Sequence, residues 1–251
     1  MKYYEGFSFV NSKGEECVIY KYRNSRDIDV LFKDTGVVVN TCIARVSDGK
    51  ISDPTKPTVC NFGFNTRGEY NSHTYQNGKA IPSDCYVKWS SMIRRCYDEN
   101  QRSRNKEYLD CSVCDEWRLF QNFAEFYFSC KYIGCGWELD KDILTKGNRV
   151  YSKDTCCFIP KEVNNLLSLN KNARGSLPIG VSLKSNGRFT VNFNIDGVVK
   201  NFGTFETVQQ AFMKYKCEKE KHIKTVTDRY KEVLDERVYN ALMTWEIDYE
   251  D

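Results

Sequence analysis

Two aspartates that flank a lysine, Asp140 and Asp142 around Lys141, are the residues whose types and spacing point most directly to chemistry. Carboxylate oxygens are the ligands that magnesium prefers, so this pair is a candidate site for a hard divalent cation. Lys141 is a cation at neutral pH and cannot accept a proton unless it is strongly desolvated, although it could contact a phosphate. The alternative is a hairpin with Leu139 buried and its charges solvated, and the sequence favours this alternative.

A second candidate for metal chemistry is the pair Cys111 and Cys114, which has the CxxC spacing of a zinc knuckle. A structural zinc site needs two further ligands. They would have to come from thiols with less regular spacing: Cys130, Cys135, Cys156 and Cys157. The alternative is a turn that enters a helix, with Cys114 packed under Trp117, and the sequence favours that turn over zinc.

The composition is that of a folded protein. Of 251 residues, 41% are hydrophobic and 14% aromatic, which is enough to bury cores and excludes wholesale disorder. No apolar run approaches the ~18 residues of a membrane span. The first residues lack the apolar core of a signal peptide, so we expect no membrane association and a cytoplasmic location. The net charge of +3 neither demands nor excludes a nucleic-acid partner.

The cysteine content agrees with that location. Twelve cysteines make up about 5% of the chain, below the ~8–10% that is typical of a disulfide scaffold. In a chain of this length without a secretion signal, we expect reduced thiols, most of them buried.

The order of the patterns predicts an α+β protein with several domains. Short β-branched runs separated by Asn-Ser, Asp-Thr-Gly and Ser-Asp-Gly turns predict four or five strands, and hence a small β-barrel-like domain over residues 1–66. Gly, Asn, Ser and Thr are frequent after these strands, and residues 67–82 are predicted to be a linker.

Helical spacing begins after Ser83, the predicted N-cap of a helix. Two strands around a loop and a short helix complete this second domain, residues 83–170. Its second helical stripe is expected to be core rather than a surface that stacks on bases: Trp117, Phe120, Phe123 and Tyr127. Residues 171–251 comprise three strands joined by Ser-Asn-Gly and Asp-Gly turns, followed by a long amphipathic helix.

Three motifs occur in order between Asp84 and Leu167: WSSMIRRCYD, YLDCSVCDEWRLFQNFAEFY and LDKDILTKGNRVYSKDTCCFIPKEVNNL. Together they resemble bacteriophage HNH homing endonucleases. The resemblance implies a ββα core with one metal ion, in which a histidine activates water, an asparagine orients it and a third His or Asn helps to hold the metal. At these positions the chain has Asp140-Lys141, residues near Thr155-Cys156, and Asn164. Because Lys141 stands where the histidine is expected, the core is predicted to be degenerate.

The C-terminal segment contains Gly180-Val181, Gly187-Arg188-Phe189, Phe202-Gly203-Thr204-Phe205 and Ala211. This skeleton resembles the plant ethylene-response-factor (APETALA-like) DNA-binding domain. The resemblance implies a three-stranded sheet that lies in the major groove, with a helix packed behind it.

Because alternate strand residues share a face, one face of this sheet is expected to be polar. The residues expected to contact DNA are Ser182, Lys184, Arg188, Asn192, Asn194, Asn201 and, from the helix, Tyr215. The residues expected to meet the helix are Val181, Leu183, Phe189, Val191 and Phe193. Most base-reading positions hold Ser, Lys or Asn rather than Arg or Trp, so we expect modest affinity. An ordinary solvated sheet face is the alternative.

The two resemblances imply a phage-encoded DNA-binding protein that derives from an HNH homing endonuclease and has weak or lost nuclease activity. Double-stranded DNA is then the expected partner, the host bacterial cytoplasm the expected location, and Mg²⁺ and a structural Zn²⁺ the candidate cofactors. One alternative is an active metal-dependent DNA endonuclease. The other is a nuclease scaffold reused to bind and inhibit a host defence protein complex, which rests on fold-level analogy alone.

Overall fold

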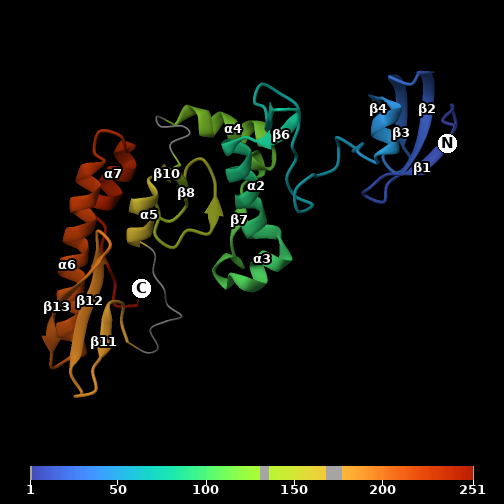
Figure 1. Ribbon diagram of the computed structural model, residues 1–251. Helices are drawn as coiled ribbons and strands as arrows, with labels where there is room; N and C mark the ends of the chain where they lie inside the picture. The colour runs from blue at the N-terminus through green and yellow to red at the C-terminus, as the bar shows by residue number, and fades with distance from the viewer. Residues whose placement is uncertain (1, 131–135, 168–176, 251) are drawn as a thin grey trace. The chain divides into compact units, whose positions relative to one another are not determined.

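The computed structural model describes residues 2–130, 136–167 and 177–250 (Figure 1). The α-helices are α1 (Ile43–Ser47), α2 (Asp84–Tyr97), α3 (Glu99–Arg104), α4 (Phe120–Ser129), α5 (Lys161–Leu167), α6 (Val208–Arg229) and α7 (Glu236–Met243). Two short 3₁₀ helices are η1 (Lys106–Tyr108) and η2 (Asp115–Arg118). The mixture of helices and strands agrees with the predicted α and β composition.

The strands form several small sheets. In chain order they are β1 (Ser8–Val10), β2 (Glu16–Asn24), β3 (Asp27–Phe32), β4 (Val38–Thr41), β5 (His73–Gln76), β6 (Lys79–Pro82), β7 (Ser112–Val113), β8 (Glu138–Asp140), β9 (Val150–Tyr151), β10 (Cys157–Ile159), β11 (Val181–Leu183), β12 (Phe189–Ile195) and β13 (Val198–Phe205). The chain divides into two compact units: Met1–Asn105 with Asp115–Phe123, and Lys106–Cys114 with Ala124–Asp251. The residues of the expected second domain, 83–170, are therefore shared between both units.

The N-terminal strands form an open sheet and not the expected barrel. Strands β1 to β4 pair antiparallel in chain order, so β1 and β4 are its two edges. These edge strands, three and four residues long, do not pair with each other, so the sheet stays open. Helix α1 covers the apolar face instead, and its Val46 belongs to the same buried cluster as the strand residues Cys17, Ile19, Ile28, Val30 and Phe32.

A β-hairpin lies within the stretch that was expected to be a linker. Strands β5 and β6 pair from His73 opposite Pro82 to Gln76 opposite Lys79. The connecting residues Asn77 and Gly78 both have positive φ, 49° and 74°. A two-residue turn of this kind matches the twist of a hairpin, and Asn-Gly is its preferred sequence.

Aromatic packing on α2 forms the rest of the first unit. Trp89 is fully buried, and its Nε1 donates a hydrogen bond to the backbone oxygen of Trp117 at 2.7 Å. The predicted N-cap is confirmed, because Ser83 Oγ accepts a hydrogen bond from Tyr86 N at 3.2 Å. The stripe predicted as core is also confirmed: Trp117, Phe120, Phe123 and Tyr127 are all buried.

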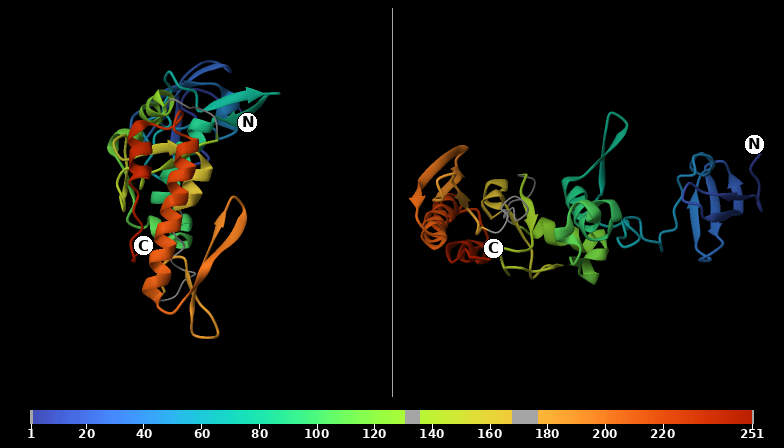
Figure 2. Two further views of the ribbon diagram at one scale, coloured as in Figure 1. Left: turned by 90° about the vertical axis from the view of Figure 1, so that its left-hand side faces the viewer. Right: turned by 90° about the horizontal axis from the view of Figure 1, so that it is seen from below.

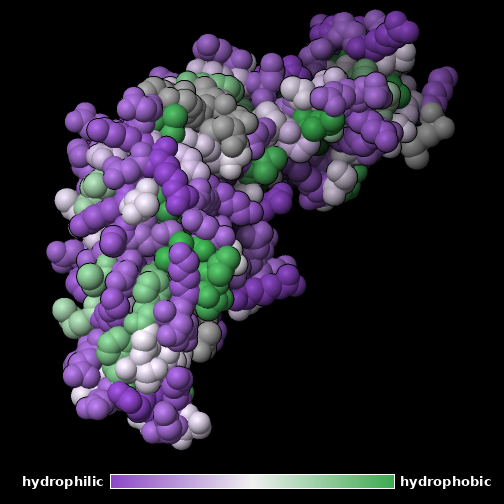
Figure 3. All heavy atoms as spheres, turned by 60° about the vertical axis from the view of Figure 1, so that its left-hand side comes forward, coloured by the Kyte–Doolittle hydropathy of each residue, from purple (hydrophilic) through white to green (hydrophobic). Residues whose placement is uncertain are grey.

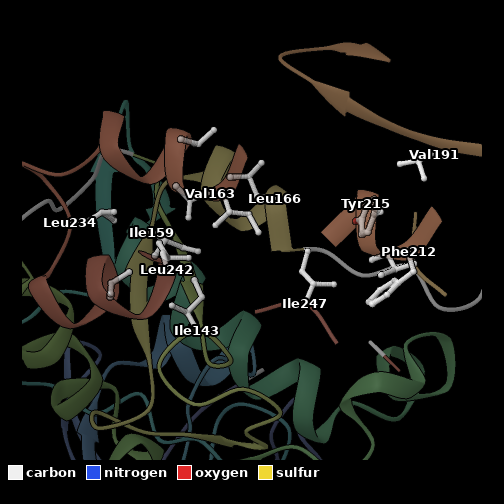
Figure 4. Packing of buried hydrophobic residues seen from close by; sticks show 14 of the residues in the cluster. Ile143, Ile159, Val163, Leu166, Val191, Phe212, Tyr215, Leu234, Leu242 and Ile247 are labelled. Atoms are coloured by element: carbon white, nitrogen blue, oxygen red, sulfur yellow. The ribbon is translucent and has the colours of Figure 1, made fainter. Parts of the chain in front are cut away.

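In the second unit, β8 and β10 pair antiparallel and α5 follows, which is a ββα order. The same unit holds the antiparallel sheet β11–β12–β13, with α6 packed on one face. One buried cluster joins both parts: it contains Ile159 and Val163 of the ββα segment together with Val191, Tyr215 and Leu242. Figure 4 shows side chains from this cluster, among them Ile159, Val163, Val191, Tyr215 and Leu242. Residues on both sides of the expected domain boundary at 170/171 therefore share a core.

Among the described helices, none is both long and apolar enough to cross a bilayer. The face drawn in Figure 3 is predominantly hydrophilic, with hydrophobic residues gathered in a few smaller groups.

Candidate nucleic-acid interface and the ββα segment

The face of the β11–β13 sheet that points away from α6 is polar. Pairing places Ser182 opposite Thr190, Thr190 opposite Thr204, and Asn192 opposite Asn201. Residues that pair directly share a face. We call this set the outer face: Ser182, Lys184, Arg188, Thr190, Asn192, Asn194, Val199, Asn201 and Thr204. It includes six of the seven residues that the sequence analysis expected to contact DNA, and no acidic side chain belongs to it.

A β-bulge at Gly203 places both Asn201 and Thr204 of β13 on the outer face. Between the pairs Thr190–Thr204 and Asn192–Asn201, strand β13 has one residue more than β12. Gly203 has a φ of +120°, which side chains rarely adopt. The extra residue allows Asn201 and Thr204, three positions apart, to lie on the same face, whereas regular alternation would put them on opposite faces.

Hydrogen bonds around the bulge hold the amide groups of the outer face in place. Asn201 Nδ2 donates to Asn192 Oδ1 at 2.6 Å and to Thr190 Oγ1 at 3.2 Å. Thr190 Oγ1 in turn donates to the backbone oxygen of Gly203 at 3.1 Å. Thr190 and Thr204 were not among the expected site residues. A glycine within a strand pattern was the sequence signal that could have located the bulge.

Two cations of the outer face flank the turn between β11 and β12. Lys184 Nζ donates to Thr204 Oγ1 at 3.3 Å. Arg188 lies 3.9 Å from the exposed carboxylate of Glu206, a surface ion pair of the kind that contributes little to stability. Both side chains can therefore turn to a phosphate at small cost. Residues 171–210 contain five Lys or Arg against two acidic residues, and two of these cations, Lys171 and Arg174, lie outside the described residues.

Tyr215 does not lie on the outer face, in contrast to the expectation. It is buried, and its ring packs so closely under Gly180 that a Cβ on that glycine would lie 2.0 Å from Tyr215 Cδ2. Its ring also meets Phe193 edge-on, with centroids 5.6 Å apart. Tyr215 comes from α6, which packs on the opposite face of the sheet, so it is a core residue and cannot contact a ligand on the outer face.

The helix-facing side of the sheet is confirmed in part. Val181 and Val191 are buried, and Phe189 and Phe193 pack against the cluster as partly buried side chains. Leu183, which was expected to meet the helix, is 60% exposed. It lies at the last position of the short strand β11.

In the ββα segment, Lys141 is a structural cation. It is 8% exposed, and its Nζ donates to both carboxylate oxygens of Asp142 at 2.8 and 2.7 Å and to the backbone oxygen of Asn148 at 3.0 Å. An ammonium group has three donors, so these three bonds occupy all of them. The Asn148 side chain returns a bond from Nδ2 to Lys141 O at 2.9 Å and thereby closes the loop. Neither a general base nor a phosphate contact is available from Lys141 in this arrangement.

The neighbouring polar residues are also satisfied within the protein. Asp140 Oδ1 accepts hydrogen bonds from Asp142 N at 2.7 Å and Ile143 N at 2.9 Å, and burial raises the pKa of the Asp140 carboxyl. Asn164 of α5 donates to the carboxylate of Glu138 on β8. The structure thus places Asn164 against Glu138, which was not among the expected site residues.

The carboxylates Asp140 and Asp142 do not fit a divalent cation in this geometry. Both oxygens of Asp142 face an ammonium, and one oxygen of Asp140 is held by backbone N–H groups. Over residues 2–130, 136–167 and 177–250, no three His, Cys, Asp or Glu side chains gather in a way that could hold a metal ion. The magnesium site stays a prediction that this geometry does not support.

Cys111 and Cys114 flank the short strand β7, which pairs with β9. Cys111 is buried and its Sγ donates to Glu107 O at 3.7 Å, while Cys114 N donates to Tyr151 O at 2.9 Å. Burial raises the pKa of Cys156 to about 12, and it raises that of Cys157 as well, so both thiols are protonated in the metal-free protein. Cys135 lies outside the described residues. The zinc site stays a prediction, and none of the described cysteines forms a disulfide.

Comparison of the chain with protein-family models, with curated proteins and with solved structures finds no match. The assignment of a function therefore depends on the residues and geometry of this chain.

Proposed function

We propose that the protein binds double-stranded DNA through the outer face of the β11–β13 sheet and that its ββα segment does not cleave DNA. The observation that carries the proposal is the outer face, which has no acidic side chain of its own and on which two cations accompany three asparagines and the hydroxyl residues Ser182 and Thr204, while Thr190 is buried beneath them. Cations neutralise phosphates, and asparagine amides match the donor and acceptor pattern of adenine in the major groove.

The motif order that resembles HNH homing endonucleases supports a phage-encoded origin from such an enzyme, with DNA binding retained in the host cytoplasm. The environment of Lys141 supports the loss of cleavage. Its ammonium is paired with Asp142 and buried, so it cannot act as a general base for water.

Binding is tested by fluorescence anisotropy with a labelled duplex of about 30 base pairs at several salt concentrations. Removing both cations of the outer face in Lys184→Ala/Arg188→Ala should weaken binding and reduce the magnitude of the log–log salt slope by roughly 2, because each phosphate contact contributes about 0.9. The matched control is Lys221→Ala/Lys224→Ala, which removes two exposed cations from α6. An unchanged slope in the sheet variant, or no binding by the parent at low salt, contradicts the proposal.

Cleavage is tested by incubating supercoiled plasmid with the parent protein, with and without Mg²⁺. We expect no nicking above the protein-free control. Robust Mg²⁺-dependent nicking would favour the endonuclease alternative. If neither binding nor nicking occurs, the protein-inhibitor alternative becomes the leading one.

A further inference from the structure

The β5–β6 hairpin is exposed on both faces. Of its eight strand residues only His73 is partly buried, and Tyr75 is 77% exposed. Figure 2 shows the two strands extended as an arm. A two-stranded hairpin without a packed face is marginally stable at best in water. A bound partner that covers one face would therefore stabilise the hairpin.

The base of this arm is firmly held. Gln121 of α4 accepts a hydrogen bond from Tyr70 N at 3.0 Å and donates to Tyr70 O at 3.0 Å. Ser83 N donates to Ser72 O at 2.9 Å, which ties the two ends of the arm together at the start of α2. The rings of His73 and Tyr86 lie 5.1 Å apart. The base of the hairpin is thus fixed to the rest of its unit by hydrogen bonds on both strands.

The chemistry of the arm suits a nucleic acid. Residues 70–83 contain no Asp or Glu, in a chain that has 34 of them. The end of the arm carries two amides, Gln76 and Asn77, and one cation, Lys79, and Tyr75 presents an aromatic ring next to them. Amide side chains can pair with base edges and a lysine can neutralise a phosphate.

The shape of the arm also suits DNA. The major groove of B-DNA is about 12 Å wide and admits a two-stranded β-ribbon as well as an α-helix. Pairing places Gln76 opposite Lys79, so one face of the arm ends in an amide and a cation, whereas Tyr75 and Ala80 lie on the other face. The Gln76–Lys79 face therefore carries the polar groups that a contact in a DNA groove needs.

We propose that the β5–β6 arm is a second DNA-contacting element, which inserts its Gln76–Lys79 end into a groove of the duplex. This inference rests on the proposed DNA binding. It adds a contact in a different unit of the chain from the β11–β13 sheet.

The test compares Gln76→Ala/Lys79→Ala with the parent and with Lys50→Ala. The latter removes an exposed cation that follows α1, outside the arm. The Asn77-Gly78 turn is kept, and circular dichroism checks folding. We expect the arm variant to bind about tenfold more weakly and its salt slope to fall by about 0.9. Hydroxyl-radical footprinting should show the loss of one protected segment. Lys50→Ala should leave the footprint unchanged.

The outcomes separate the two proposals. If the parent binds DNA and the arm variant has the same affinity, slope and footprint, the arm inference is overturned while the proposed function stands. If Lys184→Ala/Arg188→Ala keeps the parent's affinity and slope but the arm variant loses binding, the sheet interface is overturned and the arm remains. If the parent does not bind DNA at low salt, both are overturned, and a protein partner becomes the occupant to seek.

Discussion

The ammonium of Lys141 is bonded to both carboxylate oxygens of Asp142, at 2.8 and 2.7 Å, on the strand-to-loop boundary where the HNH resemblance places a catalytic histidine. A third bond, to the backbone oxygen of Asn148, spans the loop that follows. The position at which the sequence led us to expect a degenerate catalytic site therefore has a structural role in this chain.

The structural role of Lys141 leads to a prediction about stability. Lys141→Met keeps the aliphatic stem but removes all three hydrogen bonds, so it should lower the free energy of unfolding by about 1–3 kcal/mol. The expected loss is modest because Asp142 is 45% exposed and can be hydrated after the substitution. Urea denaturation followed by circular dichroism measures the change. Lys153→Met removes an exposed lysine nearby and should change stability by less than about 0.5 kcal/mol; equal effects of the two substitutions would argue against the structural role.

A second prediction concerns acid stability of the N-terminal sheet. Hydrogen bonds from Arg23, and next from Asn40, lower the pKa of Asp29 to about 2, below its ordinary value of 3.8. A carboxyl whose pKa is lowered on folding contributes stability above about pH 4 and loses it as the pH falls toward 2. Asp29→Asn should therefore reduce the loss of hydrogen-exchange protection in β3 between pH 5 and pH 2. The control Asp48→Asn should retain the parent's full loss, and a parent whose protection of β3 does not decrease in acid would contradict the assignment.

The buried thiols give a third prediction. Burial raises the pKa of Cys85 and of Cys156 to about 12, so almost no thiolate is present at pH 8. Iodoacetamide should modify the exposed Cys217 in the native protein, and it should modify Cys85 and Cys156 only after unfolding. Peptide mass spectrometry follows each site, and Cys217→Ser should remove the rapid phase assigned to that residue. Rapid native labelling of Cys156 would show that it is more accessible than this structure allows.

Much of the C-terminal fold could be predicted from the sequence, because its local patterns agree with the final packing. Val181 and Val191 alternate with polar neighbours, and the strands β11, β12 and β13 fall within the three predicted runs. The bulge at Gly203 could not be predicted from alternation, because one extra residue resets the pattern only within that strand. The prediction that Tyr215 contacts DNA was wrong, because a tyrosine on an amphipathic helix can face either the core or a ligand. The close packing of Gly180 against its ring shows that Tyr215 faces the core.

Other differences have equally specific causes. The Asn77-Gly78 turn is a strong hairpin signal, but the polar residues around it also have the composition of a linker. Lys141 and Asp142 are adjacent in sequence, yet neither their pairing nor the bond to Asn148 can be inferred from a pattern of charges. These contacts depend on how the loop after β8 folds back, which is a tertiary property.

The bulge at Gly203 connects the local backbone to the proposed binding face and leads to the last prediction. An alanine at this position would have to adopt a φ near +120°, and its Cβ would lie 3.2 Å from the ring of Phe205. Conformations of this kind cost of order 1–3 kcal/mol. The strand can avoid that cost by losing the bulge, which would shift the register of one segment by one residue and turn Asn201 away from the outer face.

We therefore expect Gly203→Ala to weaken DNA binding by at least tenfold even in conditions where circular dichroism shows a folded protein. Gly197→Ala is the matched control, because Gly197 also has a positive φ, +84°, but lies in the β12–β13 turn, where an added Cβ would have no atom within 4 Å. The Gly197→Ala variant should lose stability, because alanine is strained at this positive φ, but it should keep the pairing of Asn192 with Asn201. Cross-strand NOEs between Asn192 and Asn201 report the register directly. DNA binding that survives a demonstrated register shift in Gly203→Ala would mean that the outer face is not the DNA-contacting surface, because the arrangement of its asparagines would then have no effect on affinity.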